Sequence, residues 1–497
     1  MTNARVAADA PDSGAGPRPL SLKKNVAWTF FGNVVTALCQ WGILVVLAKV
    51  GTPEIVGQYA MGLAVSGPIM MFASMQLRKF QATDSHHEFR FGDYLGLVLI
   101  SSCFGWLTAT AAGWWDSDNV EGLLVISVVG LGKVCELIAD SFYGLLQQHE
   151  RLDRITKSGM LHGVSSMLAL CLGVWLTGSV LCGVIGYAAM RLLVIVTYDV
   201  PGALWILQVA GETSDKSRWR RIAAVLPEIR PRWDWSRLRP LMMLGLPMGV
   251  VSLLTSLQTN IPRYFVDDQL GKAELGIFCA IAALMMTGIT LMRALDQSCI
   301  PRLAKLHAAG SYRQFRWLFL KLIAVYLLLG VAGVWVARWG GRPLLTMIFS
   351  AEYAVHTDVL ETIMQAAVAA YLVGAISSAL VATRCIRSQL PLLCLSLLSA
   401  FVACTWLVPE YGLWGASMSM LLCKLPYILI GGVMLQRATR DVLPPTTIAL
   451  MAQSNPTRER GQMFQETSDS PSRDASALAD ESGYSAEATS PPLRRAA

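Results

Sequence analysis

Apolar stretches of about 20 residues recur along the whole chain and alternate with shorter polar segments. A helix rises 1.5 Å per residue, so each stretch can cross the hydrocarbon core of a bilayer, which is about 30 Å thick. The expected spans lie at residues 26–48, 59–77, 94–115, 121–146, 159–178, 180–199, 240–260, 275–293, 318–337, 360–382, 391–408 and 412–435. The pattern predicts an all-α polytopic membrane protein with about 12 transmembrane helices.

Composition agrees with this pattern, because 54% of the 497 residues are hydrophobic, only 15% are charged and the mean hydropathy is +0.47. A water-soluble chain of this length would carry more polar surface. The polar N-terminal residues precede a full-length span, so no cleavable signal peptide is expected. The eleven cysteines lie singly in the spans or at their inner edges, which predicts no disulfide, no metal site and no cofactor.

Lysine and arginine concentrate in the even-numbered loops, above all in the long loop between the sixth and seventh spans. The odd-numbered loops hold only Lys49, Arg263, Lys272, Arg338 and Arg342. Because cytoplasmic loops carry the excess of Lys and Arg, both termini are expected in the cytoplasm. Membrane lipids are expected partners. Such a surface can also hold anionic headgroups, although the topological signal alone accounts for most of it.

Two similar turns, 51–60 and 271–280, indicate an internal repeat. Each carries a glycine, a glutamate three residues later, a second glycine and an aromatic residue at the start of the next span. The offset equals six spans, an even number, so both halves are expected to have the same orientation in the membrane.

The repeat and the composition predict five regions. They are a disordered cytoplasmic tail at 1–22, an N-terminal six-helix lobe at 23–199, a basic cytoplasmic connector at 200–239, a C-terminal six-helix lobe at 240–436 and a second disordered cytoplasmic tail at 437–497. Arginine and tryptophan alternate in the connector, which beside membrane helices favours a surface-lying amphipathic segment and no nucleic-acid partner.

One face of the fourth span is polar. Its stripe residues, which fall within an arc of about 80° at 100° per residue, are Lys133, Glu136, Asp140, Tyr143 and Gln147. Ionisable side chains at this depth normally face a bundle interior or a water-filled path. Glu136 and Asp140 are the candidate ion-coupling residues. The alternative is a permanent Lys133–Glu136 pair with a purely structural role.

Three cations lie at a similar depth in three different spans. Lys133, Arg191 and Lys424 are each about 17 Å from the outer end of their helix. Amine and guanidinium groups suit phosphate, so these three residues are candidate substrate ligands. For Lys424 an interaction with carbonyls exposed near Pro426 is the alternative.

The first span carries polar residues on one face, among them Asn33 and Gln40. Both are candidate substrate-binding residues that line a cavity. The alternative is that they only hydrogen-bond to neighbouring helices, which contributes about 0.6 kcal/mol per bond.

Several segments resemble the Wzx-type oligosaccharide flippases, over roughly residues 20–436. This family belongs to the multidrug/oligosaccharidyl-lipid/polysaccharide exporter superfamily, which also holds multidrug and toxin extruders and lipid II flippases. The segments are SLKKNVAWTFFGNVVTALCQW (21–41), VGTPEIVGQYA (50–60), LRKFQATDSHHEFRFGDYLGL (77–97), YGLLQQHERLDRITKSGMLHG (143–163) and NIPRYFVDDQLGKAELGIF (260–278).

The resemblance implies two pseudo-symmetric six-helix lobes around a central cavity. It also implies export of polyprenyl-diphosphate-linked oligosaccharide across the cytoplasmic (inner) membrane by alternating access, for polysaccharide or lipopolysaccharide synthesis. A glycan polymerase and export machinery are implied partners. The family has no universal catalytic motif, and no enzymatic activity is expected.

Two other functions remain as alternatives. A multidrug and toxin extruder for cationic drugs would show more acids than bases inside its spans, whereas here Lys133, Arg191 and Lys424 accompany two carboxylates. A membrane-embedded glycan polymerase or ligase would present catalytic groups from a sizeable outer loop, and the longest outer loop, near Arg338 to His356, is short.

Overall fold

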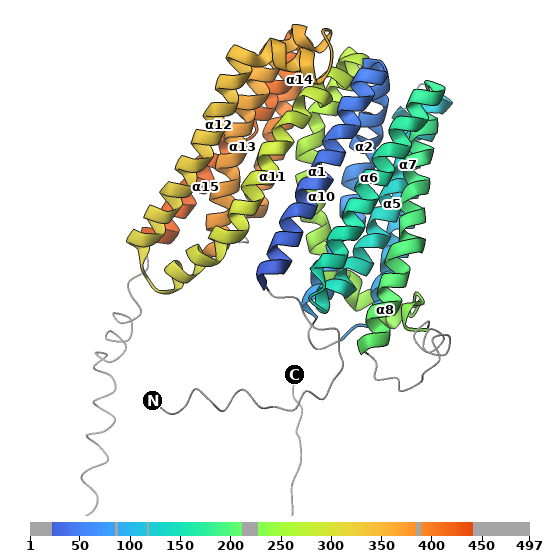
Figure 1. The fold of residues 1–497 in the computed structure, drawn as a ribbon. Helices are drawn as coiled ribbons and strands as arrows, with labels where there is room; N and C mark the ends of the chain where they lie inside the picture. Colours follow the sequence, from blue (N-terminus) through green and yellow to red (C-terminus); the bar gives the residue numbers. More distant parts are fainter. Residues whose placement is uncertain (1–21, 85–87, 117–118, 211–226, 384–388, 441–497) are drawn as a thin grey trace, which may run out of the picture. The chain divides into compact units, whose positions relative to one another are not determined.

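The computed structural model describes residues 22–84, 88–116, 119–210, 227–383 and 389–440, and the helices in these ranges belong to one compact unit (Figure 1). In the first half they are α1 (Leu22–Val50), α2 (Pro53–Ala73), α3 (Leu77–Thr83), α4 (Phe91–Asp116), α5 (Val120–Gln148), α6 (Leu152–Thr177), α7 (Val180–Val194), the π-helix η1 (Ile195–Asp199) and α8 (Val200–Ala210). In the second half they are α10 (Trp235–Leu270), α11 (Lys272–Ala308), α12 (Tyr312–Ile348), the 3₁₀-helix η2 (Tyr353–His356), α13 (Thr357–Ala382), α14 (Gln389–Leu422) and α15 (Leu425–Arg440).

Local sequence explains where several helices begin and end. Pro53 opens α2, where its missing N–H costs no helical hydrogen bond. Asn119 caps α5 by accepting a hydrogen bond from the Gly122 N–H at 2.8 Å. Gly178 ends α6 in the left-handed conformation that glycine adopts without steric cost.

The chain is a multi-pass membrane protein. Within the described residues, ten helical segments are long and apolar enough to cross a membrane. The last of them, Gln389–Thr439, is interrupted at Gly412, which has non-helical torsion angles. The all-α class is confirmed, while the count of twelve stays a prediction. Each expected span overlaps a helix of the structure, but the last two share α14, and the second of them continues into α15.

Several helices are longer than the expected spans. At 37 residues each, α11 and α12 would extend about 55 Å, well beyond the hydrocarbon core. The helix that begins at Val180 continues through η1 into α8, so the predicted connector begins as helix. Residues 211–226 of that connector, and nearly all of both predicted tails, lie outside the described residues.

The two repeat turns pack against each other. A Cβ atom added to Gly57 would lie 1.9 Å from the carbonyl oxygen of Lys272, and one added to Gly276 would lie 2.0 Å from that of Pro53. Gly57 lies four residues after Pro53, which Gly276 contacts, and Gly276 lies four residues after Lys272, which Gly57 contacts. The contact is therefore reciprocal, as between two copies related by a two-fold axis.

Helices that pack together in the first half have counterparts that pack together in the second. In order along the chain, the helices α1, α2, α4, α5 and α6 correspond to α10, α11, α12, α13 and α14. With this correspondence, the packed pair α1–α6 matches α10–α14, α2–α5 matches α11–α13, and α4–α5 matches α12–α13. Between the halves, α2 packs on both α10 and α11, and α1 packs on α11. These pairings support the internal repeat, while the limits of the two lobes stay a prediction.

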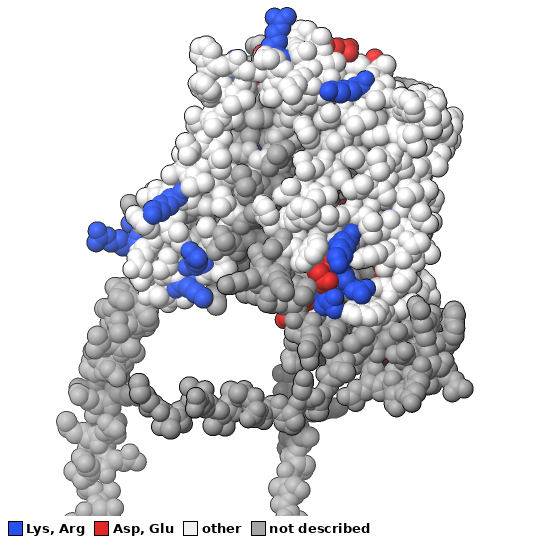
Figure 2. All heavy atoms as spheres, viewed as in Figure 1, with Lys and Arg blue, Asp and Glu red and all other residues white. Residues whose placement is uncertain are grey.

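Charged side chains are unevenly placed on the surface. The lower end of the bundle is the end at which α1 begins and α11 ends (Figure 1). On the face shown in Figure 2, Lys and Arg gather near the lower end, some lie at the upper end, and the middle is largely uncharged. An uncharged middle is what a hydrocarbon environment requires.

Candidate functional site

The polar stripe of α5 holds a three-residue ion cluster at mid-depth. Lys133 Nζ donates a hydrogen bond to Glu136 Oε2 at 2.9 Å, and Arg191 Nη1 of α7 donates to the same oxygen at 3.3 Å. The side chains of Lys133, Arg191 and Glu136 are 25%, 13% and 38% exposed. The sequence prediction placed these residues at one depth, and the structure brings Lys133 and Arg191 together on one carboxylate.

The depth of this cluster follows from the helix starts. Lys133 lies thirteen residues after Val120, and Arg191 lies eleven residues after Val180. At 1.5 Å per residue these offsets are about 20 Å and about 17 Å from the upper end. Both cations are therefore near the middle of a bilayer of ordinary thickness.

A second ion pair lies two turns further along α5. Arg78 Nη1 donates to Asp140 Oδ1 at 2.9 Å, and Arg78 Nε donates to Gln147 Oε1 at 3.4 Å. The Arg78 guanidinium also lies over the ring of Tyr143, 5.2 Å from its centre. Every residue of the predicted stripe thus has a partner, and Arg78 is the partner that sequence reasoning missed, because it was counted as a loop charge.

Arg78 reaches α5 because the chain turns sharply between α2 and α3. Met75 and Gln76 are both in the left-handed region, with φ of 44° and 54°. The short helix α3 then packs closely on α5, since a Cβ atom on Gly144 would lie 2.2 Å from Gln81 Oε1. This close approach positions the Arg78 side chain over the stripe.

A hydrogen-bond chain continues from Tyr143 of α5 to buried residues of α6 and η1. The Ser158 hydroxyl donates to Asp199 Oδ1 at 2.5 Å, so its oxygen can accept from the Tyr143 hydroxyl at 2.8 Å. His162 Nε2 lies 2.9 Å from Asp199 Oδ2. The side chains of Asp199 and His162 are 0% and 5% exposed.

Sequence reasoning also missed Asp199, His162 and Ser158. Asp199 is the last residue of η1, and π-helices of this kind occur frequently at functional sites. The available signal was an acid at the end of a strongly apolar span. Its two partners lie 37 and 41 residues away in sequence, which no periodicity within one helix could reveal.

The other predicted ligands lie apart from this network. Lys424 is at the junction of α14 and α15, about 18 Å after the break at Gly412, and is partly buried. Asn33 and Gln40 are exposed on α1, beside the face where Gly32 packs on Thr156 of α6. Among the described residues, none of these three side chains bonds to the α5 stripe.

The arrangement can exchange one anion for another. Among the described residues, the ion pairs of the α5 stripe contain the cations Lys133, Arg191 and Arg78 but only two carboxylates, Glu136 and Asp140. Arg191 Nε is buried and has no hydrogen-bond partner within the described part of the chain. A phosphate oxygen could satisfy this donor and replace a carboxylate at the cations. No cluster of three His, Cys, Asp or Glu residues suited to a metal occurs among the described residues.

Solved structures with the same fold are transporters. An inward-facing multidrug resistance MATE family transporter of the MOP superfamily matches with a TM-score of 0.65 and 15% identity, covering 82% of this chain and 96% of that one. The lipid II flippase MurJ in an inward closed conformation matches with a TM-score of 0.55 and 10% identity, covering 90% and 94%. The chain therefore has the fold of this class of membrane transporter.

Sequence comparison gives the family. The family model described as polysaccharide biosynthesis protein matches residues 22–307, which is more than half of the chain. The capsular polysaccharide biosynthesis protein CapF of Staphylococcus aureus is 25% identical over 405 residues, covering 80% of this chain and 95% of CapF. The chain belongs to the polysaccharide biosynthesis protein family, and the resemblance seen in the sequence is confirmed.

Proposed function

We propose that the protein moves a polyprenyl-diphosphate-linked oligosaccharide across the cytoplasmic membrane by alternating access, for cell-surface polysaccharide synthesis. The family and the transporter fold support a lipid-linked saccharide as cargo. The observation that carries the proposal is the mid-depth cluster, in which Lys133 and Arg191 share Glu136 and remain partly exposed. Charged groups at this depth are costly, and a role in moving an anion accounts for them.

The chemistry suits a diphosphate. The Arg191 guanidinium can donate two parallel hydrogen bonds to phosphate oxygens, and Lys133 adds a compact positive charge. We propose that Lys424 contributes a cation from the second half. Asn33 and Gln40, with exposed amide groups on α1, would bind the cargo through neutral hydrogen bonds.

Glu136 and Asp140 are the proposed coupling residues for a proton or sodium gradient. A phosphate that binds Lys133 and Arg191 leaves Glu136 without its cations and neutralises positive charge near Asp140, one turn further along α5. A partly buried carboxylate that has lost its cation at this depth then favours binding a proton or a sodium ion, so the affinities for cargo and ion are linked. Export by Glu136→Gln and Asp140→Asn, singly and together, should lose its dependence on the ion gradient. Full sensitivity to gradient collapse in all three variants would place coupling elsewhere.

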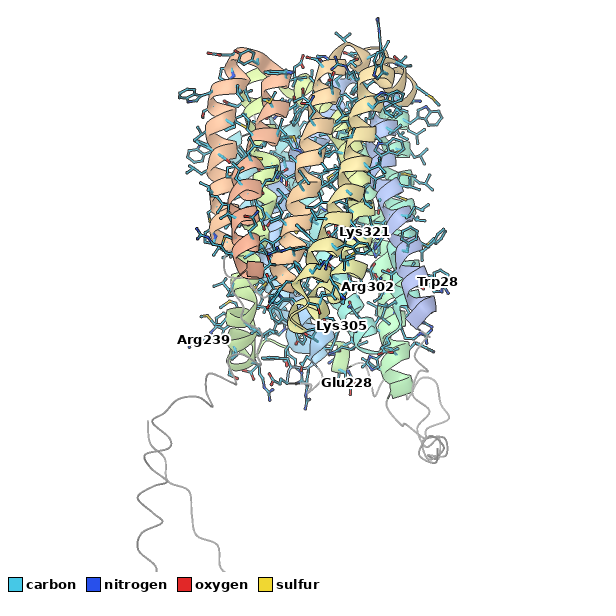
Figure 3. All side chains as sticks on the ribbon, turned by 90° about the vertical axis from the view of Figure 1, so that its left-hand side faces the viewer. Trp28, Glu228, Arg239, Arg302, Lys305 and Lys321 are labelled. Atoms are coloured by element: carbon cyan, nitrogen blue, oxygen red, sulfur yellow. The ribbon has the colours of Figure 1, made fainter. Side chains whose placement is uncertain are left out.

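Translocation of a labelled lipid-linked glycan in membrane vesicles would test the cargo assignment. Lys133→Ala and Arg191→Ala should each slow translocation by about tenfold or more, since each removes a charge-assisted contact worth about 1.5–3 kcal/mol. Lys305→Ala is the matched control, because Lys305 is exposed near the lower end of α11 (Figure 3). Normal translocation by both site variants at normal protein level would remove the assignment.

The proposed setting is the inner membrane with both termini in the cytoplasm. A glycan polymerase and the export machinery are proposed partners that receive the cargo on the far side. The competing function is extrusion of cationic drugs, which the fold alone permits. Drug efflux that persists when Lys133 and Arg191 are neutralised, without glycan translocation by the wild type, would favour that alternative.

A further inference from the structure

We propose that Arg78 forms a second anion-binding site, at which the phosphates of the cargo replace Asp140, and that the Met75–Gln76 turn transmits this exchange to α10. This inference rests on the proposed function and adds a binding step near the lower end of the site. It assigns a ligand class, diphosphate, to a residue that the sequence pattern places among loop charges.

Accessibility distinguishes Arg78 from the mid-depth cations. Its side chain is 36% exposed and that of its partner Asp140 is 39% exposed, against 25% for Lys133 and 13% for Arg191. Asp140 lies seven residues beyond Lys133 on α5, or about 10 Å nearer the lower end. An anion that enters from the lower end therefore meets Arg78 before it meets Lys133 and Arg191.

The geometry of Arg78 suits exchange. Its Nη1 binds Asp140 and its Nε binds Gln147, so the planar group already presents donors to two oxygen atoms. A diphosphate offers oxygen atoms in a similar arrangement and carries more charge than one carboxylate. The Tyr143 ring beneath the guanidinium would keep the side chain in place during the exchange.

The turn that holds Arg78 contacts the second half directly. Met75 is buried, and a Cβ atom on Gly245 of α10 would lie 2.8 Å from Met75 Cβ. One turn further along α10, a Cβ atom on Gly249 would lie 2.8 Å from the Phe72 carbonyl oxygen. Gln76 Nε2 donates to Ser252 Oγ at 3.0 Å.

The conformation of this turn is held by its surroundings. Methionine and glutamine rarely adopt positive φ, and consecutive residues in this region persist only where packing over-determines them. The contacts with α10 on one side and the Arg78–Asp140 pair on the other supply that packing. When a phosphate replaces Asp140 at Arg78, the Met75–Gln76 turn loses one of the two interactions that hold its conformation. The packing of this turn against α10 changes as a result.

Pyrophosphate binding to the purified full-length protein tests the anion site by calorimetry. Arg78→Ala should weaken binding by about tenfold, and Arg78→Lys should weaken it less, because lysine keeps the charge but loses the planar donors. Lys79→Ala is the control, since Lys79 is exposed on the same short helix. Equal affinity for the wild type and Arg78→Ala would overturn the proposal.

Asp140→Asn separates exchange from a purely structural ion pair. If Asp140 competes with the bound anion, removal of its charge should tighten pyrophosphate binding severalfold. A structural pair predicts unchanged or weakened binding. Weakened binding in this variant would contradict the exchange.

Hydrogen–deuterium exchange tests the link to α10. Pyrophosphate should change exchange together in peptides that cover 73–79 and 245–256 of the wild type, and should change neither in Arg78→Ala. A wild type in which only one of the two peptides responds would refute transmission through the turn.

Two outcomes distinguish the Arg78 anion site from the proposed cargo. If the wild type translocates glycan and Arg78→Ala binds pyrophosphate and translocates as well as the wild type, the function stands and the inference fails. If the wild type binds pyrophosphate through Arg78 but translocates no glycan, the anion site stands and the proposed cargo is wrong.

Discussion

At the residue scale, the main feature of the site is that its charges are shared. Glu136 accepts hydrogen bonds from both Lys133 and Arg191, so the two cations share one carboxylate. The sequence predicted the stripe on α5, because its spacing is a local property of one helix. It could not predict Arg78 or Asp199 as partners, since both contacts depend on how separate helices pack.

Ser158→Ala should destabilise the protein by about 1–3 kcal/mol, because it leaves buried oxygen atoms of Asp199 and Tyr143 without a partner. Thermal unfolding in detergent measures this loss. The control is Ser165→Ala on the same helix. Within the described part of the chain, Ser165 Oγ bonds only to the Leu161 carbonyl, so its removal should change stability by less than about 0.5 kcal/mol. Equal effects of the two substitutions would show that the buried chain contributes nothing particular.

At the scale of elements, the two halves pack closely where α2 crosses α11. Sequence reasoning found the two glycine-containing turns and their common orientation, but it gave no sign that the turns touch. Gly57 in one turn and Gly276 in the other each lie against the backbone of the opposite turn, where a Cβ atom would collide with a carbonyl oxygen. Periodicity along one chain segment cannot report such a contact.

Gly57→Leu and Gly276→Leu should each destabilise the protein by about 1–3 kcal/mol or prevent its folding, because the added side chain meets a backbone carbonyl that cannot rotate away. Expression level and thermal unfolding measure the effect. Gly432→Ala is the control, since a Cβ atom there meets nothing within 4 Å, and alanine should be neutral or slightly stabilising in the helix. Tolerance of leucine at both turns would contradict the close packing of α2 on α11.

At the scale of the whole molecule, hydropathy was sufficient for the fold class. Every expected span overlaps a helix, because the bilayer thickness fixes the length of an apolar segment. The expected ends were less accurate, since helices such as α12 continue beyond the hydrocarbon core, where hydropathy no longer marks them. The family followed from many weak sequence features, which the family model then confirmed.

The predicted topology can be tested in intact cells with an impermeant thiol reagent and a cysteine-free background. Ser470→Cys in the C-terminal tail should be protected, because the Lys and Arg bias places the tail in the cytoplasm. Glu352→Cys, at an exposed position between α12 and η2, should react as the positive control. Labelling of Ser470→Cys from outside would reject the orientation.

The π-helix at Ile195–Asp199 has a consequence for how this chain tolerates changes in length. Val200 N–H bonds to the Ile195 carbonyl, five residues back, so the segment holds one residue more than an α-helix of the same pitch. Deletion of one residue inside this segment would convert the wide turn to an ordinary α-helix, because the turn is what absorbs the extra residue. The residues after the segment would then keep nearly the register that they have now, and Asp199 would stay close to His162 and Ser158. A homologous helix can therefore gain or lose one residue here without moving its buried acid.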